Sequence, residues 1–326
     1  MQKKVSVVMC TYNGAAFVGQ QLDSVLAQTY PLHEIIVQDD GSKDNTWEIL
    51  EDYANRFPVI HLYHNEGRKG INGNFFSALH RATGDYIAIC DQDDIWETNK
   101  IELQLQAIGS KLMCGGFSKP FSSDGFPVKW DDRVPCLHAL RLAYLSEVPG
   151  HVQLIRKELL DLLPAQSMVT MFYDWQLQFI ASVAEQIAFV PEVLVNFRRH
   201  TQAATATKPI ETKGKEGRKT FLFLLSNHSP LHGYLKQRLQ QIEKMLDFLE
   251  KKNPDMFATE SVALVRKMIK YHCKRNFIGY IQLTFFCIKH RDLLFHAPEP
   301  KPWKARLRAA YFPLYCLNYY RGIVEN

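Results

Sequence analysis

Residues 86–96 read YIAICDQDDIW, and this stretch decides the fold. Five residues that suit a buried strand run directly into a turn with Asp91, Asp93 and Asp94. The length and β-branched content of residues 86–90 predict a central strand of a parallel sheet. In open α/β sheets, ligands bind at the carboxyl ends of the strands. Because clustered carboxylates repel one another and are costly to desolvate, we expect Mg²⁺ or Mn²⁺ between them, with substrate phosphates in its shell.

The rest of the N-terminal half alternates between strand and helix patterns. Strands are expected at 5–10, 34–38, 59–63, 112–117, 152–155, 188–191 and 193–197. Helices are expected at about 15–28, 44–57, 72–82, 97–108 and 172–184. Such an alternation predicts a mainly parallel α/β sheet. The alternative for the acidic turn itself is a solvated cap of the helix that follows it.

Length and charge indicate two parts within the 326 residues. Residues 1–212 contain 18 Lys and Arg against 25 Asp and Glu, whereas residues 213–326 contain 21 against 9. We expect an α/β domain over 1–212 and a helical, basic region over 213–326 that faces something anionic. Nucleic acid is a poor candidate for that partner because the half with the expected pocket is acidic.

Cysteine usage and hydropathy predict the compartment. The seven cysteines form no CxxC pair, which is typical of free thiols in a reducing compartment. The N-terminus leads into a strand without a signal-peptide pattern, and the apolar stretch 277–288 is too short to span a bilayer. We therefore expect a cytoplasmic protein. The basic and aromatic segment 303–312 predicts peripheral contact with an anionic membrane, with a helical cap as the alternative.

Three expected strand ends carry polar clusters, at 11–13, 39–42 and 91–94. A parallel sheet would bring them to one edge. An aromatic ring, an acceptor for a base N–H and a metal site together describe a pocket for a nucleoside diphosphate. The sequence has neither the G-x-G-x-x-G fingerprint nor a P-loop, which argues against dinucleotide enzymes and P-loop NTPases.

Residues 5–14, 39–42 and 91–96 resemble the three signatures of the family-2 inverting glycosyltransferases, which have the GT-A fold. The variant DQDDIW is similar to that of bacterial rhamnosyltransferase-like members. The resemblance implies a metal-dependent transfer, with inversion, of a sugar from a nucleoside-diphosphate donor such as dTDP-rhamnose or a UDP-sugar. It also implies that the acceptor is a growing cell-surface polysaccharide or a lipid-linked glycan.

The resemblance also implies roles for individual residues. Tyr12 would pack against the base, and Asp40, with Asp39 as the alternative, would accept from a base N–H. The metal would be held by Asp91, Asp93 and His200. The other donor-side residues are Thr11, Asn13, Lys69, Asn74, Arg198 and Arg199.

By the same resemblance, Asp174 lies where these enzymes place their catalytic base. An inverting transfer needs one carboxylate that takes the acceptor hydroxyl proton, and no covalent nucleophile. The alternative is that Asp174 caps a helix. The acceptor side would be formed by loop 121–135 and by Asp94, Trp96, Gly150, His151 and Trp175. The alternative for His151 is a purely structural role. Residues 201–212 would form a lid that donor binding orders.

Two other classes of protein remain as alternatives. A nucleotidyltransferase also uses strand-end carboxylates and a metal, but residues 10–14 lack the cation that its first loop usually carries. A catalytically inactive protein that binds sugar nucleotides is the second alternative. The joint presence of Asp91, Asp93, Asp174 and His200 argues against it.

Overall fold

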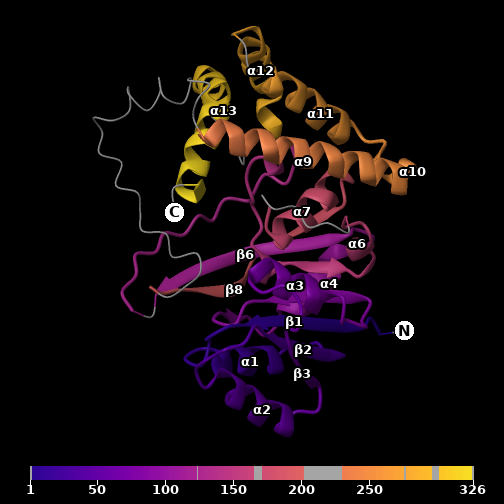
Figure 1. Ribbon diagram of the computed structural model, residues 1–326, viewed down its shortest axis with the longest axis vertical. Coiled ribbons are helices and arrows are strands. Elements are labelled where there is room, and N and C mark those ends of the chain that lie inside the picture. Colours follow the sequence, from indigo (N-terminus) through magenta and orange to yellow (C-terminus); the bar gives the residue numbers. More distant parts are fainter. Residues whose placement is uncertain are drawn as a thin grey trace.

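Four parallel strands form one half of the sheet in this computed structural model (Figure 1). In spatial order they are β3 (Ile60–His64), β2 (Glu34–Asp39), β1 (Val5–Thr11) and β4 (Tyr86–Cys90). The structure describes residues 2–122, 124–164, 171–201, 230–274, 277–295 and 301–324. Every residue of β1, β2 and β4 is buried, as expected for parallel strands with both faces covered. The prediction that residues 86–90 form a central strand is confirmed.

The other half of the sheet is mixed. Beyond β4 come β7 (Leu154–Arg156), β6 (Met113–Ser122), β8 (Ile187–Arg199) and β5 (Ile95–Trp96). The strand β7 is antiparallel to both neighbours, whereas β6 and β8 are parallel. The prediction of two late strands was wrong, because β8 is continuous. Its pairing with β6 skips from Val190 to Val193, so the intervening Pro191, which has no N–H for the ladder, lies in a bulge.

Helices connect these strands, as the alternation predicted. They are α1 (Val18–Leu26), α2 (Thr46–Arg56), α3 (Ile71–Leu79), α4 (Lys100–Ile108), α5 (Ala139–Leu142), α6 (Glu158–Asp161) and α7 (Tyr173–Val183). A 3₁₀ turn, η1 (Gly150–Val152), precedes β7. Several expected helices were longer than the observed ones, because the polar residues at their ends form turns. For example, the helix expected from residue 97 begins at Lys100.

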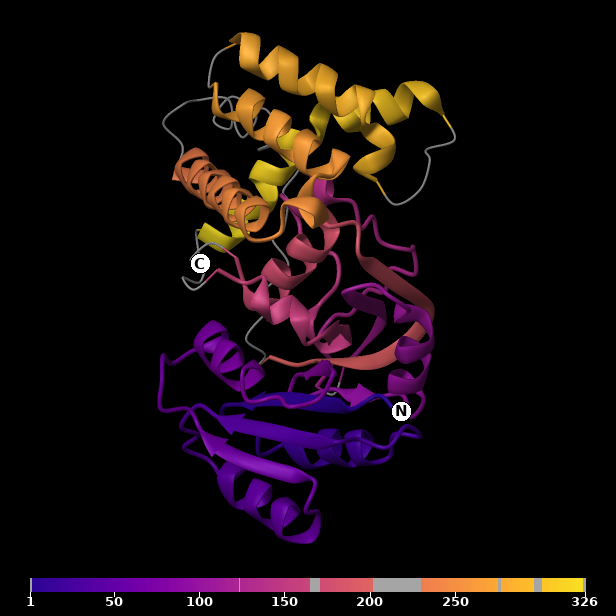
Figure 2. The same cartoon turned by 90° about the vertical axis from the view of Figure 1, so that its right-hand side faces the viewer.

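Helices also make up the C-terminal part, which lies beyond the mixed half of the sheet (Figure 2). They are α9 (Pro230–Lys252), α10 (Pro254–Phe257), α11 (Glu260–Cys273), α12 (Phe277–Lys289), η2 (Arg291–Leu293) and α13 (Pro302–Val324). The Thr259 side chain accepts from the backbone N–H of Val262 and so caps α11. No helix in the described ranges, including the 23-residue α9 and α13, has the long apolar stretch that a bilayer-spanning helix needs.

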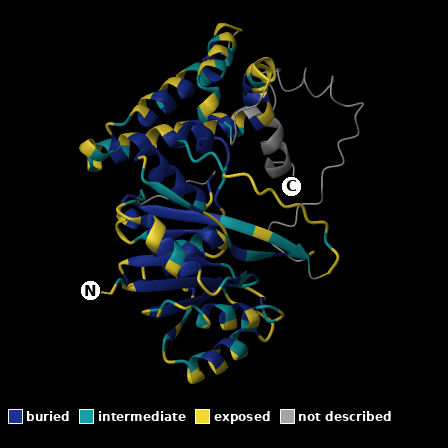
Figure 3. Cartoon of the chain, turned by 180° about the vertical axis from the view of Figure 1, so that it is seen from behind, coloured by how far each residue is buried: buried dark blue, intermediate teal, exposed yellow. Residues whose placement is uncertain are grey.

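The C-terminal helices pack directly on the α/β part. Arg238 of α9 is fully buried, donates to the carbonyl of Ala143 over 3.2 Å, and lies 3.3 Å from the ring centre of Trp175. Thr259 donates its hydroxyl to the carbonyl of Val183 over 2.7 Å. One apolar core therefore runs from the sheet into these helices, and the buried colour is continuous there (Figure 3). The predicted boundary near residue 212, and all of the predicted lid after residue 201, fall in 202–229, outside the described residues.

Candidate functional site

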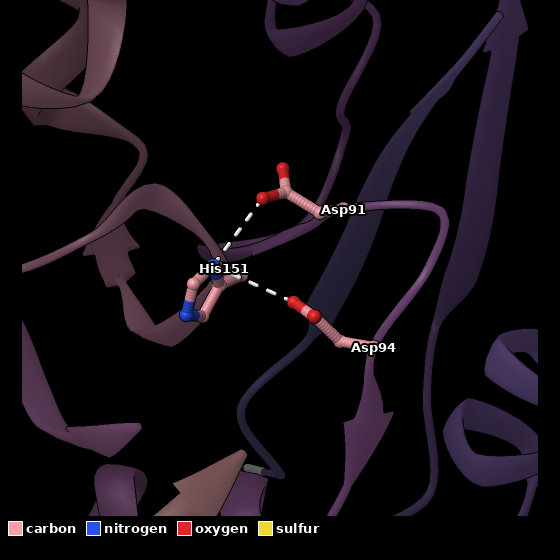
Figure 4. Close-up of side chains that lie close together, drawn as sticks. All are labelled: Asp91, Asp94 and His151. Carbon is pink, nitrogen blue, oxygen red and sulfur yellow. Dashed lines mark hydrogen bonds and ion pairs between the residues drawn. The ribbon is translucent and has the colours of Figure 1, made fainter. Parts of the chain in front are cut away.

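Three potential metal ligands meet where β4 ends. Asp91 and Asp94 follow the strand, and His151 comes from η1 (Figure 4). The Nδ1 of His151 lies 3.2 Å from Asp91 Oδ2 and 3.4 Å from Asp94 Oδ2. One ligand atom from each residue falls within 4.8 Å of the others. Three ionisable side chains thus lie together at the point where the buried apolar strand β4 ends.

The electrostatics of this trio favour a cation. Burial raises the pKa of Asp94 to about 7, although His151 opposes the shift. Burial lowers the pKa of His151, but the carboxylates of Asp94 and Asp91 outweigh it and bring the value to about 8. Asp94 is fully buried, and its Oδ2 has no hydrogen-bond partner among the described residues. Although Asp94 Oδ2 forms an ion pair with His151, a buried carboxylate oxygen without a hydrogen bond, beside a second carboxylate, fits an oxygen-preferring divalent ion.

Asp93 points to a different partner. Its Oδ2 lies 3.0 Å from Nε2 of His200, at the end of β8. Burial and the charge of Asp91 raise the pKa of Asp93, against the effect of His200. The predicted metal set of Asp91, Asp93 and His200 is therefore divided in the structure. Asp91 joins Asp94 and His151, both predicted on the acceptor side, while Asp93 pairs with His200.

Arg198 fastens this corner to β8. Its backbone N–H donates to Asp94 Oδ1 over 2.9 Å, and its Nε donates to the carbonyl of Asp93 over 2.8 Å. A further bond of 2.5 Å reaches Gln20 of α1. The predicted phosphate ligand Arg198 is thus buried and engaged with the acidic loop. Its neighbour Arg199 instead lies 5.0 Å from the ring centre of Phe126.

The turn after β2 is shaped by Asp39. Its Oδ1 accepts from the hydroxyls of Thr11 and Ser42 over 2.8 and 2.5 Å, and its Oδ2 accepts from the N–H groups of Gly41 and Ser42. Gly41 has a φ of +87°, which favours glycine. Asp39 and Thr11, both predicted on the donor side, therefore use these polar atoms to hold the turn.

Asp40 is turned toward the basic loop instead. Its Oδ1 accepts from the Asn65 amide over 2.6 Å, its Oδ2 accepts from the Gly70 N–H over 2.7 Å, and Lys69 Nζ lies at 3.6 Å. Asn74, predicted on the donor side, is buried, and both atoms of its side-chain amide pair with Gln38. The structure therefore gives Asn74 a packing position between α3 and β2.

Tyr12, predicted on the donor side, is open to solvent, with 51% of its surface exposed. Its backbone N–H and carbonyl both pair with the side-chain amide of Gln92, over 2.9 and 3.1 Å. Asn13 receives a bond from Lys43 and donates its N–H to Ser42. Hydrogen bonds thus join the three strand-end loops. Gln92 was missed because an amide between two aspartates carries no signal of this pairing.

Asp174 lies in the first turn of α7. Phe172 occupies the N-cap position, so Asp174 is not the N-cap residue itself, although its carboxylate accepts from an N–H in the first turn of the helix. Asp174 Oδ2 accepts from Gly150 N–H over 3.1 Å, and Oδ1 accepts from Trp175 N–H over 2.8 Å. Burial raises the pKa of Asp174 to about 6, and the charge of Asp91 adds to the shift. This carboxyl group therefore has the raised pKa that general bases often show.

Two tryptophans predicted on the acceptor side are buried. Trp96 packs under the Nζ of Lys100, which lies 3.9 Å from the ring centre, and Trp175 packs under Arg238. Neither ring is open to an acceptor, so this part of the prediction is corrected. The sequence could not show this burial, because Lys100, which covers Trp96, lies one turn later, and Arg238, which covers Trp175, lies on another helix.

An open cleft of about 460 Å³ lies beside His151 instead. His151 stacks on Phe197, with ring centres 4.8 Å apart, and its Nε2 lies 2.7 Å from Ser118 Oγ. The cleft is lined by Ser118 and Phe197, by Phe117, Pro149 and Arg199, and by residues 127–131 with the 43%-exposed Trp130. Its outer wall comes from loop 121–135, which was predicted on the acceptor side, although Trp130 was not singled out.

This chain is similar in sequence to known proteins over parts of its length. Residues 6–160 match the sequence profile described as "Glycosyl transferase family 2". The UDP-Glc:alpha-D-GlcNAc-diphosphoundecaprenol beta-1,3-glucosyltransferase WfgD of Escherichia coli is 43% identical over 102 residues, covering 31% of this chain and 39% of that protein. The putative teichuronic acid biosynthesis glycosyltransferase TuaG of Bacillus subtilis is 34% identical over 131 residues, covering 40% and 50%. The chain thus spans half or less of these relatives' lengths.

A solved structure resembles nearly the whole chain. The structure of S. aureus TarS 1–349 in complex with UDP-GlcNAc has a TM-score of 0.50 and 16% identity, over 98% of this chain and 89% of that one. At this identity the similarity concerns the fold alone. It confirms the predicted architecture of a mostly parallel sheet flanked by helices, with a helical C-terminal part.

Proposed function

Because this chain belongs to glycosyl transferase family 2, we propose that it transfers a sugar, with inversion, from a nucleoside-diphosphate donor to a growing glycan. The observation that carries the proposal is the placement of Asp174. This partly buried carboxylate accepts a hydrogen bond from Gly150, next to His151, and burial, together with the charge of Asp91, raises its pKa. A base and a cation site thus share one edge of the sheet.

The donor is a nucleoside-diphosphate sugar. The E. coli relative is named for UDP-Glc, which supports a UDP-sugar; dTDP-rhamnose is the alternative from the sequence. Tyr12 is exposed and stacks on the base. Asp40 accepts from a base N–H, and Lys69, which lies beside it, faces the phosphates.

Mg²⁺ or Mn²⁺ would be held by the acidic loop. In the structure Asp91 lies with Asp94 and His151, whereas the set expected from the sequence joins Asp91 to the neighbouring pair of Asp93 and His200. When bound, the ion offsets the charge that develops on the departing diphosphate. We favour Asp93 and His200, because a cation that also binds donor phosphate needs a carboxylate open to the donor, and Asp93 is partly exposed whereas Asp94 is fully buried.

Asp174 acts as the general base. It takes the proton of the acceptor hydroxyl while that oxygen attacks the anomeric carbon from the face opposite the diphosphate, which inverts the configuration. The Gly150 N–H fixes one carboxylate oxygen. The raised pKa of Asp174 makes it a stronger base than an exposed aspartate, while it remains ionised at neutral pH.

The acceptor is a growing cell-surface polysaccharide or a lipid-linked glycan. The E. coli relative is named for a diphosphoundecaprenol-linked sugar, and the B. subtilis relative for teichuronic acid biosynthesis. The cleft beside His151, with Trp130 at its outer wall, offers an aromatic surface of the kind that stacks on sugar rings. We propose that the enzyme works at the cytoplasmic membrane face, in peripheral contact with anionic lipid.

A donor screen followed by a transfer assay tests this function. Calorimetry with a panel of nucleotide sugars, with Mn²⁺ and with EDTA, identifies the donor. Incubation of that donor with a GlcNAc-diphosphate-lipid acceptor then gives a product whose anomeric configuration is read by NMR. Release of pyrophosphate from a nucleoside triphosphate and a sugar phosphate would instead indicate a nucleotidyltransferase. Donor binding without transfer to any glycan acceptor would indicate an inactive binding protein.

A further inference from the structure

Helix α12 exposes an apolar stripe. Phe277, Ile278, Ile281 and Phe285 are between 36% and 77% exposed; Phe277, Ile281 and Phe285 follow i, i+4 spacing, and Ile278 lies three residues before Ile281. The opposite side packs inward through Leu283 and Phe286. Helix α12 therefore has apolar residues on two sides, but only one side is buried against the protein. The exposed side can contact another apolar surface.

Helix α13 exposes a second stripe with the same spacing. Its members are Trp303, Leu307, Tyr311 and Tyr315, and they are between 47% and 60% exposed. Tyr and Trp are the residues that favour the boundary between water and the lipid chains. The stripe therefore has the composition of an interfacial helix face rather than of a core.

The two stripes belong to neighbouring helices. Helices α12 and α13 pack against each other, and α12 with the first turns of α13 lies at the end of the molecule opposite α2 (Figure 1). Eight of the fourteen large apolar residues exposed in the described ranges are in these two stripes. We call the eight residues together the α12–α13 face. Exposed residues are prominent at this end (Figure 3).

The charge around the face is mainly positive. Segments 274–291 and 301–323 contain nine Lys and Arg and no Asp or Glu. The exposed cations of α13 include Lys304 and Arg306. A shallow groove of about 780 Å³ between α9 and α11 is lined by Lys267, Lys270 and Lys274, together with Glu243. Pairing with a second copy through this face would bring like charges together, whereas anionic lipid complements them.

We propose that the α12–α13 face docks on a bilayer of anionic phospholipid. The two apolar stripes enter the headgroup boundary, and the cations of both helices contact lipid phosphates. The proposal rests on the peripheral membrane contact of the proposed function. It assigns that contact to a defined surface, half of which, the α12 stripe, was not foreseen from the sequence.

Vesicle co-sedimentation of the full chain tests the proposal. We expect binding to vesicles of phosphatidylcholine with phosphatidylglycerol, weaker binding in high salt, and little binding to phosphatidylcholine alone. Removing two cations near the surface costs about thirtyfold in affinity, so K304E/R306E should lose at least that much. F277S/F285S and W303S/L307S should each weaken binding as well, because each removes two apolar residues from one stripe.

Control variants separate location from overall charge. K236E/K244E changes two exposed lysines of α9 and alters net charge as K304E/R306E does, and it should retain most binding. Val134→Ser changes an exposed apolar residue outside the face and should have no effect. Equal losses for the two charge variants, or binding that ignores salt and lipid charge, would overturn the proposal.

Sedimentation equilibrium tests whether a second copy of the chain, rather than lipid, binds the α12–α13 face. A dimer that F277S/F285S dissociates would mean that a second copy covers these helices, which overturns docking on lipid. Transfer to a water-soluble acceptor analogue, measured without vesicles, keeps the enzymatic proposal separate. Wild-type transfer together with no vesicle binding would remove the docking surface and leave the transferase.

Discussion

Gly150 donates its backbone N–H to Asp174 Oδ2 over 3.1 Å, which joins the 3₁₀ turn that carries His151 to the first turn of α7. The contact is tight: a Cβ at position 150 would lie 2.4 Å from the Tyr173 hydroxyl oxygen. Glycine is therefore required there for steric reasons. Because the same turn holds the Asp174 carboxylate and the His151 ring, the position of the base depends on the backbone that also shapes the acidic corner.

Asp174→Asn should separate catalysis from binding. Asn still accepts a hydrogen bond from Gly150 but cannot take a proton, so turnover should fall by about 10²–10⁴-fold. Donor Kd should change little, because the donor side is built from the strand-end loops. Single-turnover transfer and donor calorimetry measure both quantities. Asp255→Asn, in the first turn of α10, is the matched control. A variant with near-normal turnover would show that Asp174 is not the base.

The pH profile should follow the ionisation of Asp174. Its pKa is raised to about 6 by burial, against about 3.9 for an ordinary aspartate. Because the ionised form is the active one, turnover should be highest at neutral pH and fall as the pH drops. A cation bound beside Asp91 would oppose part of the rise, so the inflection should lie between these two values. Turnover at saturating donor and metal, measured from pH 4.5 to 8, checks it. Activity that rises on acidification would contradict a carboxylate base.

Asp93→Asn and Asp94→Asn should differ in metal binding. Because Asp93 pairs with His200 and Asp94 is fully buried, we expect Asp93→Asn to cause the larger loss of Mn²⁺-dependent donor affinity. Asp91→Asn should cause a loss in either arrangement. EDTA should abolish tight donor binding by the wild type. Calorimetry of each variant with UDP and Mn²⁺ measures the effect. If Asp94→Asn were the more damaging change, the ion would belong with Asp94 and His151.

The core strands could be predicted because their signal is local. The run of residues 86–90 shows its burial in its own composition, and so do β1 and β2. The order of the mixed half could not be predicted in the same way. The insertion of β7 between β4 and β6 depends on pairing between distant segments, which leaves no periodic pattern.

The site was predictable to the level of loops but not of side-chain partners. The strand-end clusters lie together, but neighbouring aspartates have different surroundings. The Asp39 carboxylate accepts hydrogen bonds within its own turn, whereas the Asp40 carboxylate accepts from the basic loop. Asp93 and Asp94 likewise turn to different histidines. Neighbouring residues in a loop can point their side chains in different directions. Only the folded backbone decides which of two adjacent aspartates faces a given partner.

Trp175→Phe should reduce stability rather than acceptor affinity. The indole N–H donates to the Leu142 carbonyl over 2.7 Å, and Arg238 covers the ring. Phe leaves that carbonyl without this partner, which should cost about 1–3 kcal/mol of unfolding free energy. Urea unfolding measures the loss, and Trp303→Phe, at an exposed position, is the control. Unchanged stability with a raised acceptor KM would return Trp175 to the acceptor side.

Trp130→Ala should weaken the acceptor without affecting the donor. Trp130 is exposed at the outer wall of the cleft beside His151, whereas Tyr12 and Asp40 lie on the donor side. Loss of an aromatic contact of about 0.5–1.5 kcal/mol corresponds to an acceptor KM raised about two- to tenfold, with similar turnover. Initial rates at saturating donor, over a range of acceptor concentrations, give KM and turnover separately. Val134→Ala, an exposed neighbour that does not line the cleft, should leave both unchanged. An unaltered acceptor KM, or a change in donor Kd, would show that the acceptor does not use this cleft.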